Sequence, residues 1–179
     1  MEDTMVRHWQ QSGFSIIEVM VGLDIVAILA GFSAPNVQQW ARNYRLKSAV
    51  MDLHSNMQLA KAGAVKDNKP WKLQFSTTGT YTVIQCLTNT CETGTVNTDY
   101  RVSKTVNLAT AYSNEVLFKH PTSSIIADEN LLTFSSSGLT DPSGHAYVSN
   151  RTHSSYYRVG TRFIAAGIRI ERWNGSNWN

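Results

Sequence analysis

One apolar stretch of 22 residues, from Phe14 to Pro35, constrains this chain more than any other feature. Only Glu18 and Asp24 carry a formal charge within it. A helix needs about 20 mostly apolar residues to cross the hydrocarbon layer of a bilayer. The stretch therefore predicts a membrane helix. A secretory signal peptide has its small-residue cut site after the apolar run, whereas Gly13 stands before it, so a cut there leaves the helix on the mature protein.

The junction at this glycine reads Gly13-Phe14-Ser15-Ile16-Ile17-Glu18. It resembles the type IV pilin and type II secretion pseudopilin superfamily, in which a polar leader and a glycine precede Phe-Thr-Leu-Ile-Glu and an apolar helix. Pro35 stands where that superfamily usually places a helix-kinking proline. The resemblance implies that a prepilin peptidase cuts between Gly13 and Phe14, that the Phe14 amine is N-methylated, and that the helix packs into a filament. The alternative, an ordinary single-pass anchor, has no use for Glu18.

The two acidic residues of the helix have different expected roles. A carboxylate in the bilayer costs about 2.5–3.5 kcal/mol even on the lenient insertion scale, so it is kept only with a partner or a task. The cationic Phe14 amine of a neighbouring subunit is such a partner for Glu18, which makes Glu18 the expected assembly residue. Asp24 departs from the superfamily pattern and lies roughly 120° around the helix from Glu18. Two interpretations stay open for Asp24: it is protonated, or it meets a polar group of one particular neighbour.

Residues 1–13 are expected to form the cleaved leader. This segment has a formal charge of −1 if translation starts at Met1 and +1 if it starts at Met5, and both starts stay open. Beyond Pro35 the chain has 15 basic and 9 acidic residues, a formal charge of +6. A moderately basic head suggests an acidic surface or polymer as neighbour.

The apolar spacing of a helix continues after Pro35. It includes Val37, Trp40, Ala41, Tyr44, Leu46, Ala49, Val50, Leu53, Met57, Ala60 and Ala64. One helix is therefore predicted from near Phe14 to about Lys66, bent at Pro35, with the Asp67–Pro70 run ending it.

Short β-like runs separated by turn residues fill the rest of the chain. They are Trp71–Phe75, Thr80–Gln85, Tyr100–Leu108, Glu115–Lys119, Leu131–Phe134, His145–Ser149, Tyr156–Gly160 and Arg162–Trp173, followed by a polar tail to Asn179. The fold class is α+β. Residues 14–35 are expected to be the transmembrane assembly half of the helix, and residues 36–179 a single pilin-like head.

A second resemblance lies toward the end of the chain. Phe134 and Gly138 frame a Phe-x-x-x-Gly turn, and Gly167-Ile168-Arg169-Ile170 is similar to a closing Gly-Arg-Val-Arg strand, although Ile168 replaces the first arginine. Both features are typical of the GspH/FimT branch of minor pseudopilins. This resemblance implies a head of two antiparallel sheets packed on the second half of the helix, in a low-copy subunit near the filament tip.

The two cysteines, Cys86 and Cys91, are separated by four residues. This spacing supplies only half of a zinc site, whereas a head outside the cytoplasm favours a disulfide. The five histidines show no metal-binding spacing, and no nucleophile motif or phosphate-binding loop is present. We therefore expect no enzyme activity, no metal and no cofactor.

Two function classes remain. The first is a structural pilin or pseudopilin, anchored in the bacterial inner membrane with its head in the periplasm, that joins other major and minor subunits and helps to initiate a type IV pilus or a type II secretion pseudopilus. The sequence does not separate these two machines. The second is a DNA-binding minor pilin for DNA uptake, because five arginines lie close together near Tyr156, Tyr157 and Trp173. They are Arg151, Arg158, Arg162, Arg169 and Arg172.

Overall fold

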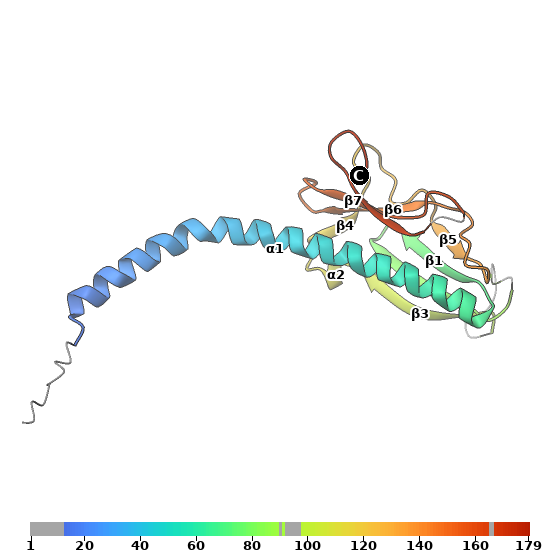
Figure 1. The fold of residues 1–179 in the computed structure, drawn as a ribbon, viewed down its shortest axis with the longest axis horizontal. Helices are drawn as coiled ribbons and strands as arrows, with labels where there is room; N and C mark the ends of the chain where they lie inside the picture. Colours follow the sequence, from blue (N-terminus) through green and yellow to red (C-terminus); the bar gives the residue numbers. More distant parts are fainter. Residues whose placement is uncertain (1–12, 90, 92–97, 165–166) are drawn as a thin grey trace, which may run out of the picture. The chain divides into compact units, whose positions relative to one another are not determined.

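The structure, a computed structural model, describes residues 13–89, 91, 98–164 and 167–179, without the side chains of residues 32–36. The chain forms two compact units, one ending at Trp40 and the other, the head, running from Ala41 to Asn179. The helix α1 spans Ile16–Asp67 (Figure 1). Its bounds agree with the predicted helix to within two residues at each end. The bend predicted at Pro35 stays a prediction, because the side chain of Pro35 lies outside the described part.

The second half of α1 supplies one side of the head's core. The seven apolar residues of the predicted stripe from Leu46 to Ala64 are at most 1% exposed, whereas Val37, Trp40 and Tyr44, earlier in the same stripe, are more than half exposed. The seven follow each other at intervals of three or four residues, with Val50 added directly after Ala49, so they form one face that packs on the sheets. The predicted apolar face is therefore confirmed as core from Leu46 to Ala64.

The end of α1 follows from its last residues. Asn68 adopts a left-handed backbone with φ 51°, and the Lys69 amide donates to the Ala64 carbonyl at 3.2 Å. This six-to-one bond is the helix-terminating Schellman arrangement, in which asparagine tolerates the left-handed position better than most residues. Pro70 then prevents the helix from continuing.

Two four-stranded antiparallel sheets complete the head (Figure 1). Sheet A has the order β3-β2-β1-β5 and is built from β1 (Trp71–Ser76), β2 (Thr80–Cys86), β3 (Tyr100–Asn107) and β5 (Leu131–Phe134). Sheet B has the order β4-β6-β7-β8 and is built from β4 (Val116–Phe118), β6 (His145–Asn150), β7 (Tyr156–Gly160) and β8 (Arg169–Arg172). The predicted α+β class, a long helix followed by two antiparallel sheets, is confirmed.

Aromatic side chains join the two sheets inside the head. Phe75 of β1 and Tyr81 of β2 both pack edge-on against Phe118 of β4, with ring centroids 5.6 and 6.3 Å apart. Such edge-to-face pairs add about 0.5–1.5 kcal/mol to the burial of the rings. The Tyr81 hydroxyl also accepts a hydrogen bond from Asn56 Nδ2 of α1 at 2.7 Å. Helix and sheets therefore share one core.

The C-terminal end of α1 packs closely on the start of β1. A Cβ placed on Gly63 would lie 2.7 Å from Cε2 of the Trp71 indole, so only glycine fits here. The Trp71 Nε1 and the Gln85 Nε2 both donate to Oδ2 of Asp67, at 3.0 and 2.8 Å. One carboxylate at the helix end thus fixes the first two strands.

The disulfide between Cys86 and Cys91 is confirmed, with their Cα atoms 5.5 Å apart. It holds Cys91 over the outer face of sheet A, where the buried Lys72 Nζ donates to the Cys91 carbonyl at 3.3 Å. The disulfide therefore also places a hydrogen-bond acceptor, the Cys91 carbonyl, beside the buried Lys72 ammonium group. An ammonium group without a partner would be costly to bury.

Gly138 explains the Phe-x-x-x-Gly motif. It has φ +75°, a conformation that favours glycine, and a Cβ there would lie 3.2 Å from Cγ2 of Val65 on α1. The turn is closed by the Gly138 amide, which donates to the Ser135 carbonyl at 2.9 Å. The motif turns the chain tightly against the helix.

Three parts of the secondary-structure prediction were wrong. In the described part of the predicted strand Arg162–Trp173, the structure has a strand over Arg169–Arg172 alone. The end of the predicted strand Tyr100–Leu108 begins a short helix, α2 (Leu108–Ala111), in which Asn107 Oδ1 accepts from the Thr110 amide. The supposed polar tail folds back: Trp173 pairs with Trp178, and the Arg172 amide donates to the Asn179 carbonyl at 2.6 Å.

Candidate assembly interface

The first turn of α1 places Glu18 at the start of the helix. The Ser15 carbonyl accepts from the amides of Glu18 and Val19, at 3.1 and 3.2 Å. Serine followed three residues later by glutamate is the capping-box spacing. The free amides of a first turn create a partial positive charge that favours a carboxylate at this position. Glu18 is therefore well placed for the helix as well as for a cationic partner.

The apolar side chains of this segment are exposed on all sides. Eleven large apolar residues between Phe14 and Leu29 are each more than half exposed. Exposed apolar surface on this scale is unusual for a soluble protein and marks a membrane or protein contact. Among the described residues, no helix is both long enough and apolar enough throughout to cross a membrane. The span predicted for residues 14–35 is thus not confirmed and stays a prediction.

Of the predicted processing residues, Gly13 and Phe14 are described and exposed. A Cβ on Gly13 would meet nothing within 4 Å, so the fold does not demand glycine at this position. The rest of the predicted leader, residues 1–12, lies outside the described residues. Glu18 and Asp24 are both exposed on α1, on different sides of the helix.

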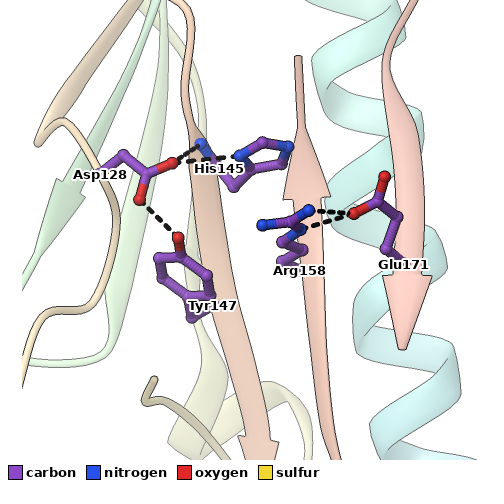
Figure 2. A network of polar contacts seen from close by, with 5 residues as sticks. All are labelled: Asp128, His145, Tyr147, Arg158 and Glu171. Atoms are coloured by element: carbon purple, nitrogen blue, oxygen red, sulfur yellow. Dashed lines mark hydrogen bonds and ion pairs between the residues drawn. The ribbon is translucent and has the colours of Figure 1, made fainter. Parts of the chain in front are cut away.

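A polar network crosses the outer face of sheet B (Figure 2). Tyr147 of β6, Arg158 of β7 and Glu171 of β8 are directly paired across the strands. The Tyr147 hydroxyl donates to Oδ1 of Asp128 at 2.5 Å, and the His145 amide donates to Oδ2 at 2.9 Å. The His145 Nδ1 lies 3.1 Å from the same Oδ2. Asp128 thereby ties its loop to β6.

This geometry shifts the pKa values of Asp128 and Tyr147. Burial alone would raise the pKa of Asp128, but hydrogen bonds from His145 and Tyr147 outweigh burial and lower it below its usual value. Burial and the Asp128 carboxylate raise the pKa of Tyr147 well above its usual value. At neutral pH the pair is therefore a carboxylate that accepts from a neutral phenol. These groups are all partnered, which suits bracing of the loop more than proton transfer.

The C-terminal turn covers this network. The Arg158 guanidinium lies 4.9 Å from the centroid of the Trp178 ring, and the Trp178 and Tyr147 rings are 5.6 Å apart. His120 packs edge-on against Tyr147 at 4.4 Å. Burial lowers the pKa of His120. Trp178 therefore anchors the chain end to the outside of sheet B.

No catalytic or metal centre emerges from these groups. Within the described ranges, no three histidine, cysteine, aspartate or glutamate side chains gather in an arrangement that could hold a metal ion. In the described part of the chain, the imidazole of the Asp128–His145 pair has Asp128 as its hydrogen-bond partner and no hydroxyl or thiol nucleophile beside it. The network therefore provides structure to the head.

The five arginines do not form one patch. Arg158 is largely buried and contacts Glu171 through Nε, at 2.6 Å, and through Nη2. Arg169 and Arg172 are exposed on β8 but three residues apart, so they point to opposite faces. Arg162 is exposed in the segment before β8, and Arg151 donates to the Asn114 carbonyl at 3.4 Å. The DNA-binding prediction stays untested. Fewer arginines are available to bind phosphates than the sequence suggested, because Arg158 is paired with Glu171.

The sequence reasoning missed the Asp128–His145–Tyr147 cluster. His145 was weighed only as a metal ligand, and Asp128 lies in a loop 17 residues earlier. The signal that was available is the spacing of His145 and Tyr147, because residues two apart in a strand share a face. Two polar residues sharing the outer face of a strand indicate a polar partner there.

Comparison with known proteins identifies the head. Residues 49–162 match the family model described as type II transport protein GspH. The chain belongs to the GspH family. This match covers most of the head, including the helix stripe from Ala49 onward, sheet A, strands β4, β6 and β7 of sheet B, and the Phe134–Gly138 turn. It confirms the predicted relationship to GspH-type pseudopilins.

A solved structure supports the same fold for this GspH family member. The chain is similar to the minor pseudopilin EpsH from the type 2 secretion system of Vibrio cholerae, with a TM-score of 0.50 and 11% sequence identity. The similarity covers 70% of this chain and 95% of EpsH. At this identity it shows the fold alone. No curated protein sequence matches the chain.

Proposed function

We propose that this chain is a minor pseudopilin of a type II secretion apparatus that enters the pseudopilus through the first half of α1. Prepilin peptidase cuts between Gly13 and Phe14, and the new Phe14 amine is N-methylated. The subunit is held in the inner membrane before assembly, with its head in the periplasm. It then helps to initiate the filament together with other pseudopilins, at or near the tip.

The observation that carries this proposal is the exposed apolar surface of α1 between Phe14 and Leu29, joined to a GspH head. Eleven large apolar side chains with more than half of their surface exposed must be removed from water by an apolar environment. Lipid supplies that cover before assembly, and helices of neighbouring subunits supply it afterwards. The GspH match favours the type II secretion apparatus over a type IV pilus.

Glu18 sets the position of the neighbour in this proposal. Its carboxylate lies in the first turn, four residues from the Phe14 amine of its own chain. The Phe14 amine of an adjacent subunit pairs with it, because an unpaired charge among apolar helices is expensive. Asp24 lies on a different side of the helix, where it is either protonated or gives one particular neighbour a second polar contact.

Removal of the Glu18 side chain tests the proposal. Glu18→Ala should leave leader cleavage intact but reduce crosslinking of this chain to other pseudopilins, since the charged contact is lost. Glu129→Ala is the matched control, because it removes an exposed carboxylate from the head. Normal crosslinking of Glu18→Ala would contradict the proposed role of Glu18. If Asp24 contacts one particular neighbour, Asp24→Val should reduce the crosslink to that neighbour and spare the others, whereas unchanged crosslinks would favour a protonated Asp24.

A further inference from the structure

Strand β3 gives sheet A a long, exposed edge. It has eight residues, Tyr100–Asn107, and stands at one end of the strand order β3-β2-β1-β5, at the margin of sheet A in Figure 1. Arg101 and the four residues after it are all exposed. Among the described residues, β2 is the only strand that pairs with β3, and no loop bonds to the main chain of residues 100–106. Such an edge presents amide and carbonyl groups that can pair with another strand.

The other three edges of the two sheets are short or partly covered. β4 has three residues, and β5 and β8 have four each. The Thr133 carbonyl of β5 accepts from the Asp141 amide at 2.9 Å. Arg172, the last residue of β8, exchanges two main-chain hydrogen bonds with Asn179, at 2.6 and 2.9 Å. Short and covered edges are a usual protection against strand pairing. In the described part of the head, β3 is therefore the edge best suited to take another strand.

The pairing of β3 with β2 determines which main-chain groups point outward. Just after β3, the Leu108 amide donates to the Gly79 carbonyl at 2.9 Å. Bonded and non-bonded residue pairs alternate along an antiparallel ladder, so Val106 and Lys104 bond to β2. Thr105, between them, directs its amide and its carbonyl away from β2.

The other end of β3 adds a second outward position. Just before β3, the Asp99 carbonyl accepts from the Leu87 amide at 2.8 Å. The same alternation pairs Arg101 with β2 and directs the main chain of Val102 outward. The two counts meet at a shift in register, where Ser103 has no partner residue on β2. Val102 and Thr105 thus offer main-chain donors and acceptors on either side of this bulge.

The charge of β3 indicates what kind of strand can pair with it. β3 contains Arg101 and Lys104 and no acidic residue. Lys104 Nζ donates to Asn56 Oδ1 at 3.2 Å and lies 3.7 Å from Asp52 Oδ1, which holds the strand against α1. Within the described ranges, no carboxylate forms an ion pair with Arg101. An added strand has side chains on both faces of the sheet, so one of its positions lies beside Arg101. A carboxylate suits that position.

We propose that the outer edge of β3 binds an extended, acidic segment of a partner protein, which joins sheet A as a fifth strand. The main-chain groups of Val102 and Thr105 supply the pairing, and Arg101 favours a carboxylate beside it. A second copy of this chain suits the edge less well, because β3 against β3 brings four basic side chains together. This binding role goes beyond filament entry, since the first half of α1 supplies none of its residues.

Amide NMR of the isotope-labelled full chain in detergent tests this proposal. The probe is the capped peptide Thr-Glu-Val-Thr-Glu-Val-Thr, titrated to about 5 mM, which detects dissociation constants near 1 mM. The amide signals of Val102 and Thr105 should shift, and those of β8 should not. The same peptide with its central amides N-methylated on both edges keeps its charge but loses donors. It should bind at least about tenfold more weakly, because two or more hydrogen bonds are lost.

Two substitutions test the cation and the edge separately. Arg101→Glu should weaken binding of the peptide about fivefold or more, because it places like charges opposite each other. Arg169→Glu is the matched control, since it makes the same charge change at an exposed arginine of β8 and should alter affinity less than about twofold. Thr105→Pro removes an outward amide but no bond to β2. It should weaken binding about threefold or more.

Several outcomes would overturn the proposal. One is the absence of any shift at about 5 mM peptide. Another is equal binding of the N-methylated peptide or by the Arg101→Glu variant, since the contact would then need neither the strand edge nor its cation. A chain that dimerises without peptide, and is monomeric as the Thr105→Pro variant, would show that a second copy occupies the edge instead. Arg101→Glu changes an exposed side chain, so its result does not depend on whether Thr105→Pro folds.

Discussion

Arg158 on β7 donates from Nε to Oε2 of Glu171 on β8 at 2.6 Å, and Nη2 contacts the same oxygen. Both side chains are only 16% exposed. The one acidic residue among the clustered arginines therefore neutralises one of them. The pair joins two adjacent strands of sheet B and supports the Trp178 ring, which covers the guanidinium.

Glu171→Gln should destabilise the head by about 1–3 kcal/mol, because it leaves the largely buried Arg158 cation without its ionic partner. Chemical unfolding of the full chain in detergent measures this change. Glu129→Gln, which alters an exposed carboxylate, should have an effect below about 0.5 kcal/mol. Equal stability of the two variants would show that the Arg158–Glu171 pair contributes nothing.

The DNA-binding hypothesis now makes a narrower prediction. If duplex DNA binds the head, Arg162→Gln and one of Arg169→Gln and Arg172→Gln should each weaken binding and reduce the salt slope by about 1, but not both of the latter, because Arg169 and Arg172 point to opposite faces. Arg158→Gln should leave the salt slope unchanged, because Arg158 is engaged by Glu171. Retention of the full chain on DNA at increasing salt measures this. Absence of salt-sensitive retention at low ionic strength would end the DNA-uptake hypothesis.

Gly63→Ala should destabilise the head by about 1–3 kcal/mol, although alanine in a helix interior is normally about 1 kcal/mol better than glycine. The reason is the Trp71 indole, whose Cε2 lies 2.7 Å from the position of the new Cβ. Gly31→Ala is the matched control on the same helix, since a Cβ there meets nothing within 4 Å. Unfolding of both variants by urea compares them. A stabilised Gly63→Ala variant would contradict the described packing of α1 on β1.

Asp128→Asn should destabilise the head at neutral pH, because the hydrogen bonds from His145 and Tyr147 favour a charged acceptor. The pKa of Asp128 is lower in the folded state than its usual 3.8. The stability that this carboxylate contributes is therefore present above that value and is lost as the pH falls through the folded pKa. The difference between wild type and variant should shrink in the same window, in unfolding curves recorded at each pH. A difference that is independent of pH would exclude a role for the charge.

Much of the fold was predictable because its signals are local. The stripe from Leu46 to Ala64 repeats at the helical period, and a helix of that period with one apolar face must bury it. The glycine and proline turns bounded most strands to within two residues, and β5 and β7 were predicted at their observed bounds. Such elements depend on neighbours within a few residues of each other.

The wrong predictions have a common cause, which is contacts between residues that are far apart in the sequence. Arg162–Ile168 has the composition of a strand, but Thr140 donates its amide to the Ile164 carbonyl, and strand pairing begins only at Arg169. The tail is polar in sequence, yet Trp178 folds back because Tyr147 and Arg158 offer it a surface on sheet B. No short-range sequence pattern predicts such contacts.

In the proposed function, cleavage after Gly13 turns this chain into a pseudopilin whose helix enters a filament. Intact-mass and peptide mass spectrometry of the protein recovered from the cell envelope tests it most directly. The mature chain should begin at an N-methylated Phe14, and the chain should stay unprocessed when Gly13 is replaced by a bulky residue. A mature chain that still carries residues before Phe14, or that begins elsewhere, would contradict it.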